Sequence, residues 1–382
     1  MVSIRRVLSK FNLNRGGYLN VKAVFLFTLL FLSLTFVQKV FGEDQHPEDI
    51  QYVQGRVIEV IEERQIEINE SKQLYQKLKI TITRGDIKDR EIIVENGLIP
   101  SAQVIKYNVG EELMISVQKD SEGQDMYYII DYVRTKALTL LFLLFVGVAV
   151  LIGSKKGLYS LVAMVLSFFI IVTFVLPQIQ QGRNPILIAI LASALMVPLT
   201  FYLSHGLNKK TTISVIATFI TLIITGIFAT IFVNRTYLTG ATSEEALFLQ
   251  TPTTHYNLKG LLLAGIIIGT LGIMDDITVS QTTIVFQLND LRKDLSISEL
   301  FKRSLQIGRD HISSMINTLI LVYVGASLPL LLLFMNNPRP FGEIINLEII
   351  AVEIVQTLVG SIGLILAVPI TTYLACLSST NK

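Results

Sequence analysis

The stretch that decides the fold is residues 260–288, with the sequence GLLLAGIIIGTLGIMDDITVSQTTIVFQL. This run is long enough to cross a bilayer, because about 20 mostly apolar residues span the hydrocarbon layer. It nevertheless contains Asp275 and Asp276, although an ionised carboxylate at the bilayer centre costs about 2.5 to 3.5 kcal/mol on insertion scales. Twelve largely apolar residues separate the pair from Asn289, so we expect the pair to be buried in a membrane helix bundle.

The composition of the whole chain indicates the same setting. The 382 residues are 51% hydrophobic and 16% charged, and the mean hydropathy of +0.57 is typical of a multi-span membrane protein. A formal net charge of +2 gives no reason to expect a nucleic-acid partner. Cys376 is the single cysteine, so an intrachain disulfide is excluded. The lipid bilayer is therefore the first partner that the sequence predicts.

Other apolar runs of spanning length flank the first one. Together they predict seven spans, at residues 136–153, 157–177, 185–204, 212–233, 259–285, 312–335 and 347–375. An eighth, shorter run at residues 23–37 follows a basic arm, so residues 1–43 form either a cleaved signal peptide or a retained signal anchor. The predicted fold is an α-helical polytopic membrane protein of about seven to eight transmembrane helices, with a seven-helix membrane domain at residues 134–382.

The basic residues of the short loops predict the orientation. One set of loops holds Lys155, Lys156, Lys209, Lys210, Arg292, Lys293, Lys302, Arg303 and Arg309, whereas the alternate set holds Arg183, Arg235 and Arg339. Cytoplasmic loops carry the excess of Lys and Arg, so the first set and the C-terminus are expected to be cytoplasmic. The polar region at residues 44–133 is then extracytoplasmic.

That extracytoplasmic region has the pattern of β-structure. Residues 77–82 alternate between polar and apolar side chains, as do parts of 55–61 and 112–117. Turn signals lie at residues 84–86, 95–97 and 108–110. Five or six short strands in about 90 residues predict a small β-barrel-like domain of the OB or SH3-like kind.

Polar residues at helical spacing suggest a site between the sixth and seventh spans, counting residues 23–37 as the first. One row consists of Asp276, Ser280, Thr283 and Gln287, and the other of Asp310, Ser314 and Asn317. Spacings of three and four place each row on one helix face. We expect these two rows to face each other, because lipid cannot satisfy them. Asp275 points about 100° away from Asp276 on the same helix.

Further residues extend this candidate ion path. Arg309 is expected to close the site on the inner side together with Asp310, and Glu353 in the last span marks an outer entrance. Close helix contact is expected at Gly265 and Gly269, which form a GxxxG step, and at Gly363. Capping boxes at residues 242–245 and 296–299 predict two short amphipathic helix starts.

The common enzyme signatures are absent from the sequence. It contains no HExxH, GxSxG or P-loop motif, and the four histidines have no metal-ligand spacing. We therefore expect no catalytic residues and no cofactor, while the sequence leaves a metal open. Intramembrane aspartyl proteolysis is disfavoured, since Asp275 and Asp276 diverge on one helix.

Several segments resemble the YibE/F-like family of bacterial multi-span membrane proteins. The resemblance rests on GTLGIMDDITVSQ (269–281), IGRDHI (307–312), NTL (317–319) and YVGASLPLLL (323–332), and it extends over roughly residues 50–375. It implies location in the bacterial plasma membrane. The activity of the family is not established, and transport is the usual suggestion for its members.

Two functions follow as expectations. The first is a secondary transporter or channel for a small ion or solute, in which Asp276, Asn317 and the row from Ser280 to Gln287 hold a proton or small cation. The alternative is a non-transporting assembly or sensing protein, whose extracytoplasmic β-domain binds a partner and whose polar rows only join helices. A second membrane subunit or a homo-oligomer is compatible with both.

Overall fold

The computed structural model describes residues 51–68, 71–100, 104–120, 123–251, 254–335 and 339–379. Contacts separate two compact units at Val148 and Ala149, which we call the β unit (residues 51–148) and the helical unit (residues 149–379). The boundary expected from the sequence, at residue 133, separates the strands from the helices, whereas the contact-based boundary lies inside the first long helix, so residues 135–148 are grouped with the β unit. The basic arm and the apolar run at residues 23–37 lie outside the described residues.

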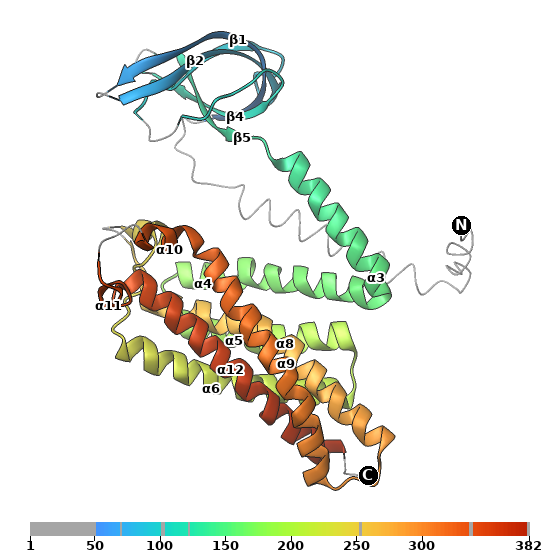
Figure 1. Cartoon of the computed structure of the whole chain (residues 1–382). Helices are drawn as coiled ribbons and strands as arrows, with labels where there is room; N and C mark the ends of the chain where they lie inside the picture. Colours follow the sequence, from blue (N-terminus) through green and yellow to red (C-terminus); the bar gives the residue numbers. More distant parts are fainter. Residues whose placement is uncertain are drawn as a thin grey trace, which may run out of the picture. The chain divides into compact units, whose positions relative to one another are not determined.

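The β unit is built on one five-stranded antiparallel sheet. Its strands are β1 (Gln51–Ile68), β2 (Ser71–Arg84), β3 (Glu91–Asn96), β4 (Glu112–Lys119) and β5 (Asp125–Tyr132). The strand order is β3-β2-β1-β4-β5, and the register pairs Val57 with Ile80 and Gly55 with Leu113. This confirms the β-rich region, although β1 and β2 are longer than the short strands that the sequence predicts (Figure 1).

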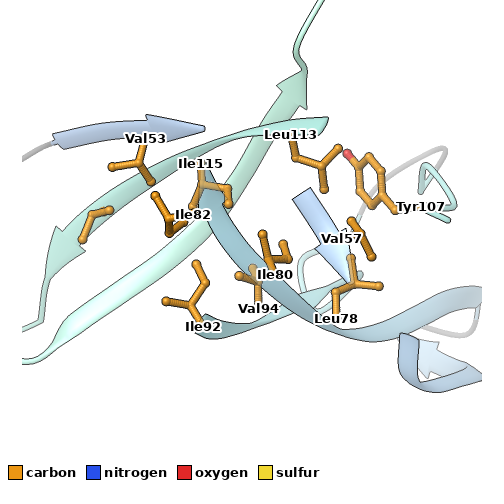
Figure 2. Packing of buried hydrophobic residues seen from close by; sticks show 11 residues of the cluster. Val53, Val57, Leu78, Ile80, Ile82, Ile92, Val94, Tyr107, Leu113 and Ile115 are labelled. Atoms are coloured by element: carbon orange, nitrogen blue, oxygen red, sulfur yellow. The ribbon is translucent and has the colours of Figure 1, made fainter. Parts of the chain in front are cut away.

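Alternation along the strands creates the core of the β unit. Leu78, Ile80 and Ile82 are fully buried on one face of β2, as the period-two pattern of residues 77–82 predicts. Figure 2 shows them packed against Val57, Leu113 and other apolar side chains of the neighbouring strands. Burying each such side chain contributes about 1.5 to 3 kcal/mol. Gly55 permits the close approach, since a Cβ there would lie 2.5 Å from Ile80 Cγ2.

The expected turns are confirmed at residues 84–86, 95–97 and 108–110. Each contains a glycine with positive φ, namely Gly85, Gly97 and Gly110. Gly97 is required for a second reason, because a Cβ there would lie 2.0 Å from the carbonyl oxygen of Leu74.

Helices make up almost all of the rest of the described chain. They are α3 (Thr135–Ile170), the π-helix η1 (Ile171–Val175), α4 (Leu176–Gln180), α5 (Pro185–His205), α6 (Lys209–Arg235), α7 (Glu244–Phe248), α8 (Leu258–Leu291), α9 (Ile297–Ala326), α10 (Leu328–Met335), α11 (Phe341–Ile344) and α12 (Glu348–Ser379). A two-residue pair, β6 (Gln250–Thr251) and β7 (Thr254–His255), precedes α8.

Five of these helical segments are long and apolar enough to cross a membrane, and α9 with α10, bent by 67°, makes a sixth. Each of the seven runs from residue 136 onward falls in one of the six. The numbers differ because 136–153 and 157–177 are counted together as the segment Thr135–Gln180. Within this segment two helices meet at a kink at Ser154, whose φ of 51° and ψ of −136° are not helical.

Of the two predicted capping boxes, the one at 296–299 is confirmed, whereas at 242–245 the N-cap is Ser243 and not Thr242, so no box with Glu245 forms. Ser296 and Glu299 form a complete capping box at the start of α9, and the Ser243 side chain accepts a hydrogen bond from the backbone N–H of Ala246 in α7. Asn257 caps α8 in the same way, by accepting from the N–H of Gly260. The polar residues before each apolar run therefore fix where the helix begins.

Within the helical unit, α6, α8 and α12 pack against one another, α5 packs on α8, and α9 packs on both α8 and α12 (Figure 1). Gly363 of α12 allows the closest approach, since a Cβ there would lie 2.4 Å from Thr225 Oγ1 and 2.8 Å from Met274 Cε. The close contact expected at Gly265 and Gly269 is wrong for the described chain, because a Cβ on either would meet no atom within 4 Å.

Candidate functional site

Helix α8 presents three different surfaces to its surroundings. One side is buried and carries Thr278, Gln281 and Thr282 among apolar residues. A second side carries the half-buried Asp275. The third side is exposed and carries Gly265, Gly269, Gly272 and Asp276. Asp276 is rotated about 100° from Asp275 around the helix axis. The two adjacent carboxylates therefore have different environments.

The buried side of α8 is joined to α6 by hydroxyl groups. The Ser214 hydroxyl lies 3.0 Å from Thr282 Oγ1 and 3.1 Å from the carbonyl oxygen of Thr278. Thr218 and Thr278 share a hydrogen bond of 2.9 Å between their hydroxyls. All four residues are almost completely buried. These contacts hold the two helices in register.

Gln281 joins α8 to two further helices. Its Nε2 donates to the carbonyl oxygen of Ser304 in α9 at 3.0 Å and to Thr372 Oγ1 in α12 at 2.7 Å. Gly308 makes room for it, since a Cβ there would lie 2.8 Å from Gln281 Oε1. We call Ser214, Thr218, Thr278, Gln281, Thr282 and Thr372 the hydroxyl–amide cluster. Each of its six side chains has a hydrogen-bond partner, so its contribution is structural.

Asp275 lies at the middle of α8, 17 residues after Leu258 and 16 before Leu291. At about 1.5 Å per residue, it is about 24 to 26 Å from either end of the helix. It lines a pocket of about 390 Å³, formed between α8, α5 and the region of α3 and η1. A carboxylate is therefore placed near the middle of a helix that is long enough to span a membrane, and beside empty space.

Four hydroxyl groups share this pocket with Asp275. Ser160 and Ser167 come from α3, and Thr200 and Ser204 from α5. The remaining lining is Ala163, Met164, Ile171, Met196, Phe201, Ile268, Leu271 and Gly272. We call these thirteen residues the Asp275 pocket. Ile171 belongs to η1, and single π-turns inside helices are frequent at functional sites.

The Asp275 carboxylate has an unused hydrogen-bonding atom. Its Oδ1 is buried and has no hydrogen-bond partner in the part of the chain that the structure describes. No ion pair joins it to a described Lys, Arg or His. Its electrostatic neighbours are Asp276 and His205, the last residue of α5. A buried carboxylate oxygen without a partner is costly, so this atom is suited to a proton or a cation.

The structure places the other predicted site residues elsewhere. Asp276, Gln287, Arg309, Asp310, Ser314 and Asn317 are exposed, whereas Ser280, Thr283 and Glu353 are half-buried. Helices α8 and α9 meet through apolar side chains instead, with Met274 and Ile277 beside Ile312 and Ile316. The two polar rows therefore do not face each other, because apolar packing occupies the contact. Of the predicted site residues, Asp275 is the one that lines the pocket.

The pocket hydroxyls are not among the residues that the sequence predicted for the site. Ser160 and Ser167 are seven residues apart, and Thr200 and Ser204 are four apart, so each pair lies on one helix face. Such a signal is weak, because a helical hydroxyl commonly bonds its own backbone. Thr200 Oγ1 does this, donating to the carbonyl oxygen of Met196 at 2.9 Å. A polar pair in an apolar span therefore does not by itself indicate a pocket.

The long apolar helices and the intramembrane carboxylate define the class of protein, a helical membrane protein. The model of the family described as YibE/F-like protein matches residues 141–381, more than half of the chain. The chain belongs to this family. The match covers the helical unit and begins after the β-sheet, whereas the resemblance in the sequence extended to about residue 50. Comparison with curated proteins gave no match, and comparison with solved structures gave none either.

Proposed function

We propose that the protein is a secondary transporter or channel for a small ion or solute, and that Asp275 carries the central ion-binding group. The observation that supports this most is the buried, unpartnered Oδ1 of Asp275 in a hydroxyl-lined pocket. Ionisable residues inside membrane spans are expensive and are by default candidates for ion pathways. This proposal keeps the expected intramembrane carboxylate and moves its partners from α9 to α3 and α5.

The proposed direction of access follows from the loop charges. Ser160 comes four residues after Lys156, and Ser204 comes five residues before Lys209. By the excess of Lys and Arg these two loops are cytoplasmic, in the bacterial plasma membrane that the family implies. The hydroxyls of the pocket would then lead from the cytoplasmic side to Asp275, which lies beside the last residues of α5. A cytoplasmic C-terminus belongs to the same proposal.

The proposed partners include a second membrane subunit or a second copy of this chain. Asp310, Ser314 and Asn317 of α9 are exposed, and hydrocarbon cannot satisfy such groups. Ser314→Cys in a Cys376→Ala background tests this by disulfide crosslinking in native membranes. A crosslinked dimer supports a copy-to-copy contact at α9, and a purely monomeric product removes it.

Ion flux into proteoliposomes tests the transport proposal. Purified full-length protein would be given proton, sodium, magnesium and manganese gradients in turn, beside the variants Asp275→Asn and Asp276→Asn. We expect flux that Asp275→Asn abolishes and that Asp276→Asn retains in large part, because only Asp275 lines the pocket. Flux that Asp276→Asn abolishes and Asp275→Asn retains would favour the site predicted between the sixth and seventh spans, which are α8 and α9. No flux of any ion would remove the proposal.

The alternative function, an assembly or sensing protein, has one supporting observation. A groove of about 670 Å³ on the β unit is lined by β3 and β5, and it contains the exposed apolar residues Ile93, Met126 and Tyr128. Exposed apolar clusters of this kind are common at binding surfaces. If this function is correct, Met126→Asp should abolish the function of the protein in cells, while Asp275→Asn leaves that function intact.

A further inference from the structure

The charges that face the Asp275 pocket are few. Asp275 is the one charged side chain among its thirteen lining residues. The neighbouring titratable groups are Asp276, which is exposed on the same helix, and His205, at the end of α5. The segment from α3 and η1 contributes no titratable side chain to the lining. The pocket therefore offers one negative charge to a bound ion.

Four residues with neutral hydroxyl groups share the pocket with that single charge, namely Ser160, Ser167, Thr200 and Ser204. The Thr200 hydroxyl donates its proton to its own backbone, so its oxygen keeps lone pairs that can accept. One carboxylate with several hydroxyl oxygens can coordinate a cation or receive a proton. It provides neither a thiolate nor a second carboxylate.

This charge count discriminates between ions. A monovalent cation on one carboxylate gives a neutral pair, whereas a divalent ion leaves one uncompensated positive charge in a pocket whose other lining residues are neutral. Protein sites for divalent ions usually supply several charged oxygen ligands. In the described part of the chain, no group of three or more His, Cys, Asp or Glu side chains could hold a metal ion.

From these observations we infer that the Asp275 pocket binds a single monovalent cation, either a proton or a sodium-sized ion held by the carboxylate and the hydroxyl oxygens. The inference rests on the proposed function and names its ion class. Magnesium and manganese ions are excluded as cargo of this pocket. The proton and the sodium ion share the same chemistry, one positive charge neutralising Asp275, and the experiment below separates them.

Labelling with dicyclohexylcarbodiimide tests the inference without requiring transport. This reagent adds a protonated carboxyl group across its C=N bond and forms a stable acylurea at apolar sites. The full-length protein would be labelled in liposomes, and peptide mass spectrometry would locate the adduct. We expect an adduct on Asp275 that is lost in Asp275→Asn, persists in Asp276→Asn and decreases as the pH rises.

Protection of Asp275 from labelling by added ions then identifies the class of ion that binds. A monovalent ion at about ten times its dissociation constant should slow labelling about tenfold, since the free fraction falls to about 1/(1 + [L]/Kd). Protection by sodium, with choline as the ionic-strength control, assigns sodium. If the labelling changes with pH and with none of the added ions, the bound ion is the proton. Protection by magnesium or manganese at lower concentration than sodium overturns the inference, as does the absence of an Asp275 adduct at every pH.

The same experiment separates this inference from the transport proposal. Monovalent protection of Asp275 in a protein that shows no flux would remove transport and keep the ion site. Flux combined with protection by divalent ions would keep transport and remove the monovalent assignment.

Discussion

Helix α8 carries two sets of polar groups that lie close together and differ in one respect. In the hydroxyl–amide cluster every side chain is hydrogen-bonded, with Gln281 reaching both α9 and α12. In the Asp275 pocket the carboxylate keeps a buried oxygen without a partner in the described chain, beside about 390 Å³ of space. The first arrangement satisfies its own side chains, and the second leaves one carboxylate oxygen without a partner.

The difference between cluster and pocket gives a criterion for polar residues in membrane helices. Buried polar groups that hold helices together are satisfied by the protein itself. A carboxylate oxygen left unsatisfied is more expensive than a hydroxyl, because its group can carry a full charge. Ser193, Ser361 and Thr371 also have a buried hydroxyl without a described partner, but these groups are neutral. The missing hydrogen bond and the ionisable group together distinguish Asp275 from these hydroxyls.

The largest expected effect is on stability in the cluster, at Gln281. Gln281→Ala removes two interhelical hydrogen bonds and leaves a void, so we expect a loss of about 2 to 4 kcal/mol. The measurement is reversible unfolding in mixed micelles by titration with dodecyl sulfate. Gln287→Ala, exposed on the same helix, is the matched control and should change stability by less than about 0.5 kcal/mol. Equal losses in both variants would contradict the interhelical role of Gln281.

The next effect concerns two glycines, one at a close helix contact and one on the exposed face of α8. Gly363→Ala would place a Cβ 2.4 Å from Thr225 Oγ1, and such overpacking should cost about 1 to 3 kcal/mol. Gly269→Ala meets no described atom and should be neutral or stabilise by up to about 1 kcal/mol, because Ala favours the helix. The same unfolding titration measures both variants. A loss in Gly269→Ala as large as that in Gly363→Ala would indicate that another chain packs on this face of α8.

The sequence predicts the elements of the fold well, because their signals are local. The period-two pattern of residues 77–82 lies inside β2, and the turn signals coincide with Gly85, Gly97 and Gly110. The predicted apolar runs from residue 136 onward coincide with long helices, and Ser296 caps α9 as expected. Length, periodicity and capping are properties of a segment by itself, so they can be recognised without knowing its neighbours.

The site depends on neighbours, and there the sequence alone was insufficient. The spacing of Asp276, Ser280 and Thr283 suggested a buried polar face, yet Asp276 is exposed. A rotation of about 100° along α8 decides which aspartate enters the pocket, and that rotation is set by the packing of residues such as Met274 and Ile277. The hydroxyls of Ser160 and Thr200 come from other helices, so their approach to Asp275 is not encoded in any local pattern.

A smaller effect should separate a cluster hydroxyl from a pocket hydroxyl. Thr278→Val breaks the hydrogen bond with Thr218, and interhelical bonds of this kind average about 0.6 kcal/mol, with a maximum of about 1.7. Thr200→Val removes a hydroxyl that bonds its own helix, so unfolding should be unchanged within about 0.5 kcal/mol while flux decreases. Unfolding titration and proteoliposome flux measured on both variants would test this. Thr278→Val losing flux without losing stability would reverse the two assignments.

The smallest effect extends the comparison to water-exposed charges, where partners exist and contribute little. Lys136 and Arg56 hydrogen-bond Glu112 at 2.7 Å and 2.6 Å, and they lower the pKa of its carboxyl below the usual range. A lowered pKa in the folded state stabilises the protein above the unfolded-state pKa, and this stabilisation disappears as the pH falls through the folded-state pKa. Glu112→Gln should therefore weaken amide-exchange protection of β1 and β4 above about pH 5, and the difference from the native chain should disappear as the pH falls through the lowered folded-state pKa. Glu67→Gln, on an exposed site of β1, is the control for removing a surface carboxylate. Surface pairs are screened by water and salt, so the expected difference is small. A difference for Glu112→Gln that persists unchanged into acid would show that the residue acts through packing and not through its charge.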